Sequence, residues 1–541
     1  MKESKILGFI AGAHSCGAAY VKNGEVIAVI EEERLTRIKP HTDFENSFER
    51  YPINSVNCLR DRYGVNFDEI DYFTSFFPPD TGIEIFRAAF LYQIPKEKYI
   101  HIDHHEAHCI LSYYTSGFSD DTLVFCADAS GGVNGHSSRT YLGTRGRLEY
   151  LDGITTKRKS LGHFYAALTE FLGYKRLKDE GKIVGLSGHG NLWHNLYEAW
   201  SKVIKIEGCQ TDADNHHIEA GGVYLDLFTK FYEVVGSKYW KWKSAVEDIA
   251  FTGQTVFEEK VVELIRNLHQ RVPHTRKLAL SGGIFANVKL NKKINEMIEF
   301  DEIFVLPPMG DEGLAFGCCL GALKKIHPQF EPYKLKDVFL GNEYSAQEFM
   351  DAAQGFRREE LNIDKVAELL KDRKILGLYQ GRSEHGPRAL GNRSIICDPS
   401  HPETYDILNG KLERNDYMPF APAVLDEDVD MIFNLNKSKY TAEFMTLLVD
   451  TKEEWKDKIP TVIHPKDKTA RIQIVTETSN PLFYQILKKY KEVSGAGILV
   501  NTSFNIHNEP IVETPQNAFH HLKNGIIDYL VTPFGIYSLV K

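Results

Sequence analysis

Short apolar runs alternate with longer amphipathic stretches along the first 325 residues of the chain. Apolar runs bounded by turn residues predict β-strands, whereas apolar positions spaced three and four residues apart predict helices. This alternation predicts an α/β domain. The predicted strands are residues 5–12, 25–32, 122–130, 277–283 and 302–308, and the predicted helices are residues 163–172, 245–268 and 312–325.

The stretch from residue 327 to residue 345 contains two prolines, several turn residues and little periodicity. This composition is typical of a connector between folded units. We therefore expect two domains, residues 1–345 and residues 346–541. The second is also mixed α/β, with a predicted helix at residues 362–373 and predicted strands at residues 374–380, 444–450, 470–477, 497–503 and 528–533.

The size and charge of the chain exclude several classes of protein. Its 541 residues, 43% of them hydrophobic, suffice for large cores. The net charge of -10 and the lack of a long basic run predict no nucleic-acid partner. No apolar stretch approaches the roughly 18 residues that span a bilayer. The N-terminus runs directly into a strand-like pattern rather than a signal peptide. We expect no membrane partner and a cytoplasmic location.

The eight cysteines do not point to chemistry of their own. No two stand in a CxxC arrangement, so a zinc finger is not expected. Most lie in apolar runs, where a buried thiol in a reducing compartment behaves as a small hydrophobic side chain. We assign them no catalytic role.

Four glycine-bearing turns follow or flank predicted strands, at residues 8–19, 126–135, 279–287 and 308–317. Glycine lets backbone N–H groups approach phosphate oxygens, and a helix N-terminus adds partial positive charge. One such turn is more often only a tight turn, but four of them in an α/β pattern resemble the two-lobed actin, sugar-kinase and Hsp70 superfamily. No Walker A motif is present.

Two histidines four residues apart form the centre of a candidate metal site. On a helix, His104 and His108 project from one face, the arrangement that chelates a single cation. Asp128 follows a predicted strand and Asp311 stands in a GDEG turn. Two imidazoles with two carboxylates suit Fe(II), Mn(II) or Zn(II) better than Mg(II). Because both carboxylates stand in phosphate-type turns, such a metal would contact a bound nucleotide or its phosphoryl group.

Cationic side chains are dense on the turn-rich segments of the second domain. Several converging guanidinium groups would suit a phosphoanhydride substrate, since each grips phosphate or carboxylate oxygens in bidentate fashion. The alternative is a set of solvated or salt-bridged surface charges, which is weakest for Arg388 and Arg393 beside a glycine-rich turn. The residues are Arg388, Arg393, Lys411, Arg414 and Arg471.

Motifs along the chain resemble known families. HHxxH from residue 104, DxSGG from residue 128, SGGxxxNxxLN from residue 281 and GDxG from residue 310 resemble the tRNA threonylcarbamoyladenosine synthase family. AHSCGAAYV from residue 13, EEERLTRIK from residue 31, EGKIVGL from residue 180 and four segments of the second half narrow the resemblance to the NodU/CmcH/TobZ-type O-carbamoyltransferases. Those four segments are residues 381–394, 407–424, 468–475 and 497–512.

The resemblance implies a first domain of the actin/sugar-kinase-like (ASKHA) type, similar to threonylcarbamoyladenosine synthase, and a YrdC-like second domain. It implies Fe(II) at His104, His108, Asp128 and Asp311, and ATP with Mg²⁺ and carbamoyl phosphate as substrates. The nucleotide and carbamoyladenylate contacts that it implies are Lys39, Gly131, Gly282, Gly283, Asn287, Gly310, Arg388, Arg393, Lys411, Arg471, Asn501, Ser503 and Asn505.

The resulting hypothesis has two steps. The second domain, with Arg388 and Lys411 as catalytic residues, would adenylate carbamate released from carbamoyl phosphate. The first domain would then pass the carbamoyl group to a hydroxyl of a small-molecule natural product, such as an antibiotic, a nodulation factor or a toxin. A metal there would stabilise negative charge developing on carbonyl or phosphate oxygens.

The base that deprotonates the acceptor hydroxyl has three candidates. His14 is the first, and Asp226 and Asp248 stand in segments where a pocket position and a helix cap are equally compatible with the pattern. Ser15 stands where the family pattern has a carboxylate that orients the acceptor, so the sequence leaves the acceptor open.

Three other functions compete with this hypothesis. A tRNA threonylcarbamoyl-transfer enzyme fits the first domain, but the acidic net charge argues against it. A non-catalytic ATP-gated binding module explains neither the HHxxH cluster nor the cationic second domain. A metallopeptidase fits poorly, because HHEAH lacks the HExxH order that presents a base beside zinc.

Overall fold

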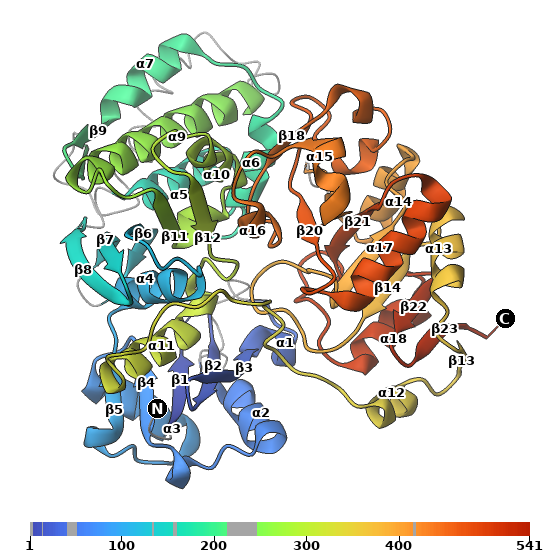
Figure 1. The fold of residues 1–541 in the computed structure, drawn as a ribbon, viewed down its shortest axis with the longest axis horizontal. Helices are drawn as coiled ribbons and strands as arrows, with labels where there is room; N and C mark the ends of the chain where they lie inside the picture. Colours follow the sequence, from blue (N-terminus) through green and yellow to red (C-terminus); the bar gives the residue numbers. More distant parts are fainter. Residues whose placement is uncertain are drawn as a thin grey trace. The chain divides into compact units, whose positions relative to one another are not determined.

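The computed structural model of the chain, drawn in Figure 1, is divided by its internal packing into two compact units. Unit 1 comprises Met1–Phe73, Ile85–Gln93 and Lys336–Lys541, and unit 2 comprises Thr74–Glu84 and Ile94–Leu335. Unit 1 thus combines N-terminal with C-terminal sequence. The predicted boundary near residue 345 stays a prediction. The structure describes residues 4–12, 15–39, 51–132, 135–154, 160–213, 246–414 and 418–540.

A five-stranded sheet, in the order β12-β11-β6-β7-β8, forms the centre of unit 2. β11 pairs in parallel with β12 and with β6, whereas β6, β7 and β8 are successive antiparallel strands. Because β6, β11 and β12 run in one direction, the turns that follow them meet at one edge of the sheet. The strands are β6 (Thr122–Gly131), β7 (His136–Thr144), β8 (Arg147–Asp152), β11 (Lys277–Ser281) and β12 (Glu302–Val305).

Helices cover this sheet. α4 packs against β6, β7, β11 and α11, and α5 packs against β6 and α9. Gly317 lets α11 approach α4, because a Cβ there would lie 2.4 Å from the Ala107 carbonyl oxygen. The helices are α4 (His104–Thr115), α5 (Leu161–Phe171), α6 (Glu180–Ser187), α7 (His194–Val203), α9 (Val246–Arg271), α10 (Val288–Asn295) and α11 (Leu314–Ile326), with 3-10 turns η6 (Gly283–Ala286) and η7 (Asp311–Gly313) and a two-stranded sheet of β9 (Ile204–Glu207) and β10 (Gln210–Ala213).

An eight-stranded sheet, in the order β13-β23-β22-β14-β15-β21-β16-β20, forms the larger part of unit 1. Its core joins the apolar faces of α13 (Ile363–Lys371) and α17 (Pro481–Ser494) to the central strands. α18 (Pro515–Lys523) packs against β14, β22 and β23. The strands are β13 (Phe356–Glu359), β14 (Leu376–Tyr379), β15 (Arg393–Cys397), β16 (Ala421–Leu425), β20 (Gln473–Val475), β21 (Ile498–Ser503), β22 (Tyr529–Thr532) and β23 (Gly535–Leu539).

The N-terminal segment begins with three antiparallel strands, β1 (Lys5–Ile10), β2 (Gly17–Lys22) and β3 (Glu25–Glu31). Their sheet has the order β3-β2-β1-β4-β5, where β4 is Tyr72–Ser75. The other α-helices and strands of the described residues are β5 (Tyr99–His101), α1 (Glu32–Thr36), α2 (Ile53–Tyr63), α3 (Pro79–Phe90), α12 (Ala346–Ala352), α14 (Glu403–Lys411), α15 (Val429–Ile432) and α16 (Lys439–Ala442), with a small sheet of β17 (Phe433–Asn434), β18 (Val449–Thr451) and β19 (Thr469–Ala470).

The predicted α/β class is confirmed, and the predicted strands at residues 122–130, 277–283 and 302–308 correspond to β6, β11 and β12. The predicted strand at residues 444–450 is wrong for its first five residues. Met445 there has a left-handed backbone (φ 57°), which interrupts an extended run. Within the described residues, no helix is long and apolar enough to cross a membrane.

Candidate metal centre and cationic site

The helix α4 presents the two histidines of the predicted metal group. Asp103 caps its N-terminus, because the Oδ1 atom accepts hydrogen bonds from the backbone N–H groups of His105 (3.0 Å) and Glu106 (3.3 Å). Asp103 is itself held by an ion pair of 3.2 Å with Arg139 on β7. The cap fixes the start of the helix at His104, so the imidazole one turn later projects from the same face.

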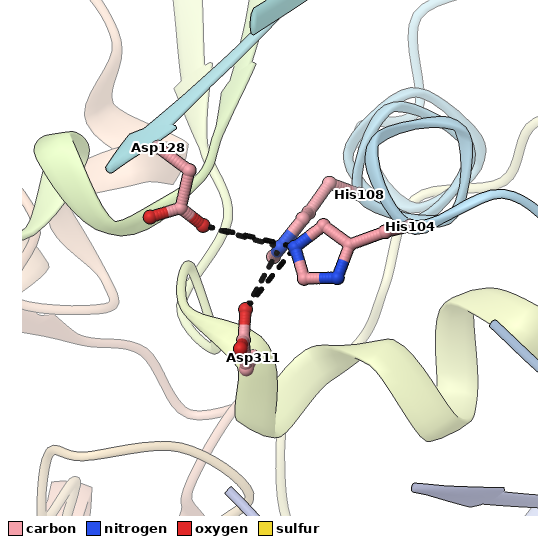
Figure 2. A group of neighbouring side chains, drawn as sticks. All are labelled: His104, His108, Asp128 and Asp311. Carbon is pink, nitrogen blue, oxygen red and sulfur yellow. Dashed lines mark hydrogen bonds and ion pairs between the residues drawn. The ribbon is translucent and has the colours of Figure 1, made fainter. Parts of the chain in front are cut away.

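The two aspartates reach this face from one edge of the sheet. Asp128 stands near the end of β6, and Asp311 begins η7 after β12. These strands lie on either side of β11 and parallel to it, so their carboxyl ends point to the same edge. Figure 2 shows both carboxylates directed toward the imidazoles of α4.

The four side chains form a compact group. The Nε2 atom of His104 lies 3.5 Å from Asp311 Oδ1 and 4.0 Å from Asp128 Oδ2. The Nε2 atom of His108 lies 3.4 Å and 3.7 Å from the same two atoms. One potential ligand atom from each residue fits within a span of 4.8 Å. Two ligands of one transition metal, each about 2.1 Å from it, stand roughly 3 to 3.5 Å apart.

Burial of these imidazoles and carboxylates costs free energy unless a positive ion is bound between them. His104 and His108 are buried, and both ring nitrogens of His104 and the Nδ1 atom of His108 have no hydrogen-bond partner. Burial disfavours the charged imidazole of His104, but Asp311 and Asp128 outweigh it, so the pKa of His104 is raised. Burial lowers the pKa of His105 well below its usual value, which leaves that neighbour neutral. The donor set fits a divalent transition metal.

The predicted nucleotide-binding glycines surround the group. A Cβ on Gly131 would lie 2.3 Å from Nε2 of His104, and a Cβ on Gly283 would lie 3.0 Å from Oδ1 of Asp128. Gly282 has a φ of 97°, a conformation that favours glycine. Gly310 precedes Asp311 and is the N-cap of η7. These four glycines therefore stand next to the metal group, and their contact with a nucleotide stays a prediction.

Asn287 has protein partners for both ends of its amide. Its Oδ1 atom accepts from the backbone N–H of Leu290 (3.1 Å) and from Gln254 Nε2 (3.0 Å), and its Nδ2 atom donates to Gln254 Oε1 (2.9 Å). The residue thereby caps α10. Its predicted approach to adenosine stays a prediction.

The candidate bases differ in what the structure describes. His14 and Asp226 lie outside the described residues. Asp248 is in the first turn of α9, and its Oδ1 atom accepts from the backbone N–H of Asn191 (2.7 Å). Lys39 is half-buried and close enough to Glu33 to oppose the burial that raises the pKa of that carboxyl. Ser15 is half-buried as well.

In unit 1, three of the predicted cationic residues converge. Burial and the charges of Arg388 and Arg414 lower the pKa of Arg471 well below its usual value. The Nε atom of Arg471 is buried without a hydrogen-bond partner. Arg414 also lies over the ring of Phe420, with 4.7 Å between its guanidinium carbon and the ring centroid. The charges of Arg388 and Arg414 repel that of Arg471, so the arrangement is suited to an anion that the three share.

Arg393 and Lys411 have protein partners instead. Arg393 is fully buried, and its two terminal nitrogens donate to backbone carbonyls of Gln380, Asn392, Asn342 and Gly381 at 2.7–3.1 Å. Its guanidinium also stacks on Tyr379 at 3.7 Å. Lys411 donates to the carbonyl of Gly525 (2.7 Å) and pairs with Asp528 (3.3 Å). Substrate contacts of either residue stay predictions.

The three polar residues predicted around β21 remain candidates for binding. Asn501 donates to the carbonyl of Ala389 (3.2 Å) and to Gln473 (2.6 Å), while its Oδ1 atom is buried without a hydrogen-bond partner. Asn505 donates to two carbonyls of its own loop, and its Oδ1 atom is equally unsatisfied. Ser503 ends β21 and is half-buried.

The sequence pattern missed the residue that folds the loop around Arg388. Glu384 is buried, and its Oε1 atom accepts from the backbone N–H groups of Leu390 (2.8 Å), Asn392 (2.8 Å) and Arg393 (3.0 Å). One carboxylate oxygen therefore fixes the backbone of residues 390–393, the part of the loop that follows Arg388. The sequence offered one indication, a glutamate within a turn rich in glycine, proline and asparagine. A carboxylate in such a turn can accept hydrogen bonds from the backbone N–H groups around it.

Comparison with known proteins gives the family of the chain. A family model described as carbamoyltransferase N-terminus matches residues 5–100 and 82–320, and one described as carbamoyltransferase C-terminus matches residues 367–537. Nodulation protein NolO of Bradyrhizobium diazoefficiens is 30% identical over 444 residues, which cover 80% of this chain and 78% of the relative. Nodulation protein NolNO of Sinorhizobium fredii is 29% identical, covering 98% of this chain and 79% of the relative.

Among solved structures, HypF in a phosphate- and nucleotide-bound form covers 60% of this chain and 57% of its own, with a TM-score of 0.35 and 14% identity. A similarity this low supports no further argument. The two family models together span most of the sequence, on both sides of residue 345. The chain therefore belongs to the carbamoyltransferase family.

Proposed function

We propose that this carbamoyltransferase activates carbamate at one site and transfers the carbamoyl group at a second site. Carbamoyl phosphate is first hydrolysed to carbamate and phosphate. A carbamate oxygen then attacks the α-phosphorus of ATP, forming carbamoyladenylate and releasing pyrophosphate. Finally, an acceptor hydroxyl loses its proton to a base and attacks the carbonyl carbon, and AMP leaves.

The observation that carries this proposal is the group of His104, His108, Asp128 and Asp311, with four ligand atoms within 4.8 Å, in a member of the carbamoyltransferase family. The group adjoins glycine turns through which a phosphate could approach. When bound, a divalent metal, proposed to be Fe(II), supplies positive charge at the transfer site. His104 and His108 would hold it through neutral ring nitrogens, and Asp128 and Asp311 would offset its charge.

Activation of carbamate is assigned to unit 1. Arg471, with Arg388 and Arg414 beside it, offers positive charge to the phosphates of ATP and carbamoyl phosphate. The unsatisfied Oδ1 atoms of Asn501 and Asn505 are acceptors for the amide of carbamate or for ribose hydroxyls. Arg388 and Lys411 remain the proposed catalytic residues of this step, and Mg²⁺ accompanies ATP.

The acceptor is proposed to be a small molecule with a hydroxyl group, and the location cytoplasmic. The relatives named nodulation proteins support a small acceptor. A nucleic-acid acceptor is not proposed, since the net charge of -10 would repel a polyanion.

The test is to incubate the anaerobically purified, metal-loaded protein with ATP and carbamoyl phosphate. Pyrophosphate release that needs both substrates supports the proposal. Mass spectrometry of added hydroxyl compounds should detect the product in which a carbamoyl group replaces one hydroxyl hydrogen. No pyrophosphate release under any metal condition would overturn the activation step.

A further inference from the structure

The segment of residues 31–37, which we call the α1 segment, has a chemistry that the proposed reaction does not explain. It is Glu-Glu-Glu-Arg-Leu-Thr-Arg, and it includes the short helix α1. The side chains of Glu31, Glu32 and Arg34 are buried. Charged side chains are seldom buried unless they are paired, because the loss of hydration is costly. Their partners therefore indicate their role.

Glu32 anchors the segment to α2. Its Oε1 atom accepts from the backbone N–H (2.8 Å) and the Nδ2 atom (2.7 Å) of Asn54. Its Oε2 atom accepts from the backbone N–H and the hydroxyl of Ser55, both at 2.7 Å. Four hydrogen bonds to one carboxylate fix α1 on the start of α2, so the segment is a rigid support.

Glu31 and Arg34 hold the backbone of the loop that carries Arg388. Glu31 Oε1 accepts from the backbone N–H of Gly386 (2.6 Å) and lies 3.1 Å from Nδ1 of His385. Arg34 donates from Nη2 to the carbonyl of Gly386 (2.8 Å) and from Nε to Glu31 (3.2 Å). Both polar groups of Gly386 are thus engaged, and its φ of 111° is one that side chains rarely adopt.

Electrostatics favours the charged forms of this pair. Burial opposes ionisation of Glu31, but Arg34 and His385 outweigh it and lower the pKa of Glu31 to about 2. Arg34 faces further carboxylates at Glu384 and Glu513, and its pKa is raised despite its burial. Glu31 and Arg34 are therefore both charged throughout the neutral range, so their hydrogen bonds to Gly386 are charge-assisted.

Arg37 holds a second loop of the activation site. Its Nη1 and Nη2 atoms donate to the carbonyls of Ile511 (2.6 Å) and Pro510 (2.7 Å). The same loop begins at Asn505, and it folds back where Val512 donates to the carbonyl of Phe504 (2.9 Å). The α1 segment therefore contacts both the loop that carries Arg388 and the loop that begins at Asn505.

We propose that the α1 segment is a positioning element of the carbamate-activation site, in which Glu31 and Arg34 fix Arg388 and Arg37 fixes the loop that begins at Asn505. Arg388 is two residues beyond Gly386 and two before Leu390, which Glu384 holds. Its backbone is therefore fixed on both sides. This inference rests on the proposed function for the substrate involved, and on the hydrogen bonds alone for the positioning.

The test compares Glu31→Gln and Arg37→Ala with wild type and with Glu69→Gln, a surface control whose partner is Lys5. Glutamine keeps the shape and an acceptor for Gly386 but loses the charge that binds Arg34 and His385. The KM for carbamoyl phosphate in pyrophosphate release should rise roughly 10- to 100-fold, as expected when a binding group is displaced by about 1 Å. The metal content of both variants should stay at the wild-type level, and Glu69→Gln should keep the wild-type KM.

Two further readouts keep a general loss of stability apart from mispositioning. Backbone hydrogen exchange of residues 385–390 should quicken about 10-fold or more in Glu31→Gln, while that of α17 stays unchanged. Arg37→Lys, which retains a donor, should recover part of the KM lost in Arg37→Ala. If Glu31→Gln does not fold, the comparison of Arg37→Ala with Arg37→Lys decides the outcome.

Two different results separate this inference from the proposed function. If wild type releases no pyrophosphate, the proposed function fails, and the exchange measurement alone decides the positioning. If wild type is active while Glu31→Gln and Arg37→Ala keep the wild-type KM and exchange rates within two-fold, the positioning inference is overturned.

Discussion

The metal group of unit 2 and the cationic site of unit 1 are built in opposite ways. The metal group stands on regular elements, with two histidines one turn apart on α4 and two aspartates at the ends of parallel strands. The cationic site stands on loops, which buried carboxylates hold in place. Regular elements transmit sequence spacing directly into geometry, whereas loops depend on partners elsewhere in the chain.

The largest effect is expected from removing a metal ligand. His108→Ala should lower bound metal and carbamoyl transfer roughly 100-fold or more, since second-shell changes alone cost 10- to 100-fold. Pyrophosphate release should remain within a few-fold, because the proposed activation site is a different one. Metal analysis and the two product assays measure this, with the exposed His274→Ala as control. An equal loss of both activities would indicate that activation and transfer occur at one site.

Arg471→Met should reduce pyrophosphate release roughly 100-fold, because a charge-assisted contact to a phosphate is lost. Its melting temperature should stay the same or rise, since burial and the charges of Arg388 and Arg414 disfavour the charged guanidinium in the folded state. Thermal denaturation and kinetics measure the two effects. A large fall in the melting temperature would instead assign Arg471 a structural role.

Arg393→Met sharpens the comparison within the cationic site. Arg393 donates to four backbone carbonyls, so its loss should destabilise unit 1 by about 3 kcal/mol or more. Urea denaturation measures this free energy of unfolding. A variant as stable as wild type, with weakened ATP binding, would support the predicted substrate contact instead.

Gly131→Ala tests how closely the glycine turn meets the metal group. The new Cβ would lie 2.3 Å from Nε2 of His104, so the ring must move and metal affinity should fall about 10-fold. Gly181→Ala is the matched control, because nothing lies within 4 Å of a Cβ there. Metal titration measures the affinity of both variants. Equal affinities would show that the turn can shift away from His104 without weakening metal binding.

The smallest effect concerns pH. The pKa of Glu31 is lowered to about 2 from an ordinary 4.5, so its stabilising contribution is complete above pH 4.5 and is lost as the pH falls toward 2. The stability difference between wild type and Glu31→Gln should therefore narrow over that window. Denaturation series at pH 7 and at pH 3.5 measure it. A constant difference would mean that the charge of Glu31 contributes nothing.

The contrast between the two sites also explains what the sequence could predict. His104 and His108 were predicted because a four-residue spacing on a helix has one geometric outcome. Asp128 and Asp311 were predicted because they follow strand-like runs. The contact of Glu31 with Gly386 joins residues 355 positions apart, and no local pattern encodes it. Arg393 and Arg471 were both predicted to contact substrate, but Arg393 donates to four backbone carbonyls whereas Nε of Arg471 has no hydrogen-bond partner, and no local pattern encodes that difference.

Local sequence patterns likewise predicted single elements of the fold but not its long-range packing. The α/β alternation predicted β6, β11, β12 and α9 because each stands in a strongly apolar or periodic run. The grouping of residues 1–73 with residues 336–541 in one compact unit depends on long-range packing. Short strands such as β18 and β19 owe their extended form to pairing with each other rather than to their own residues.

The central claim is that activation and transfer occur at different sites, and Asp311→Asn and Arg471→Gln test it most directly in two parallel assays. For each variant, pyrophosphate release and the carbamoylated acceptor are measured in the same reaction mixture. The account predicts that Asp311→Asn releases pyrophosphate near the wild-type rate but forms no adduct, whereas Arg471→Gln does neither. Adduct formation by Asp311→Asn at the wild-type rate, or loss of pyrophosphate release in that variant, would contradict it.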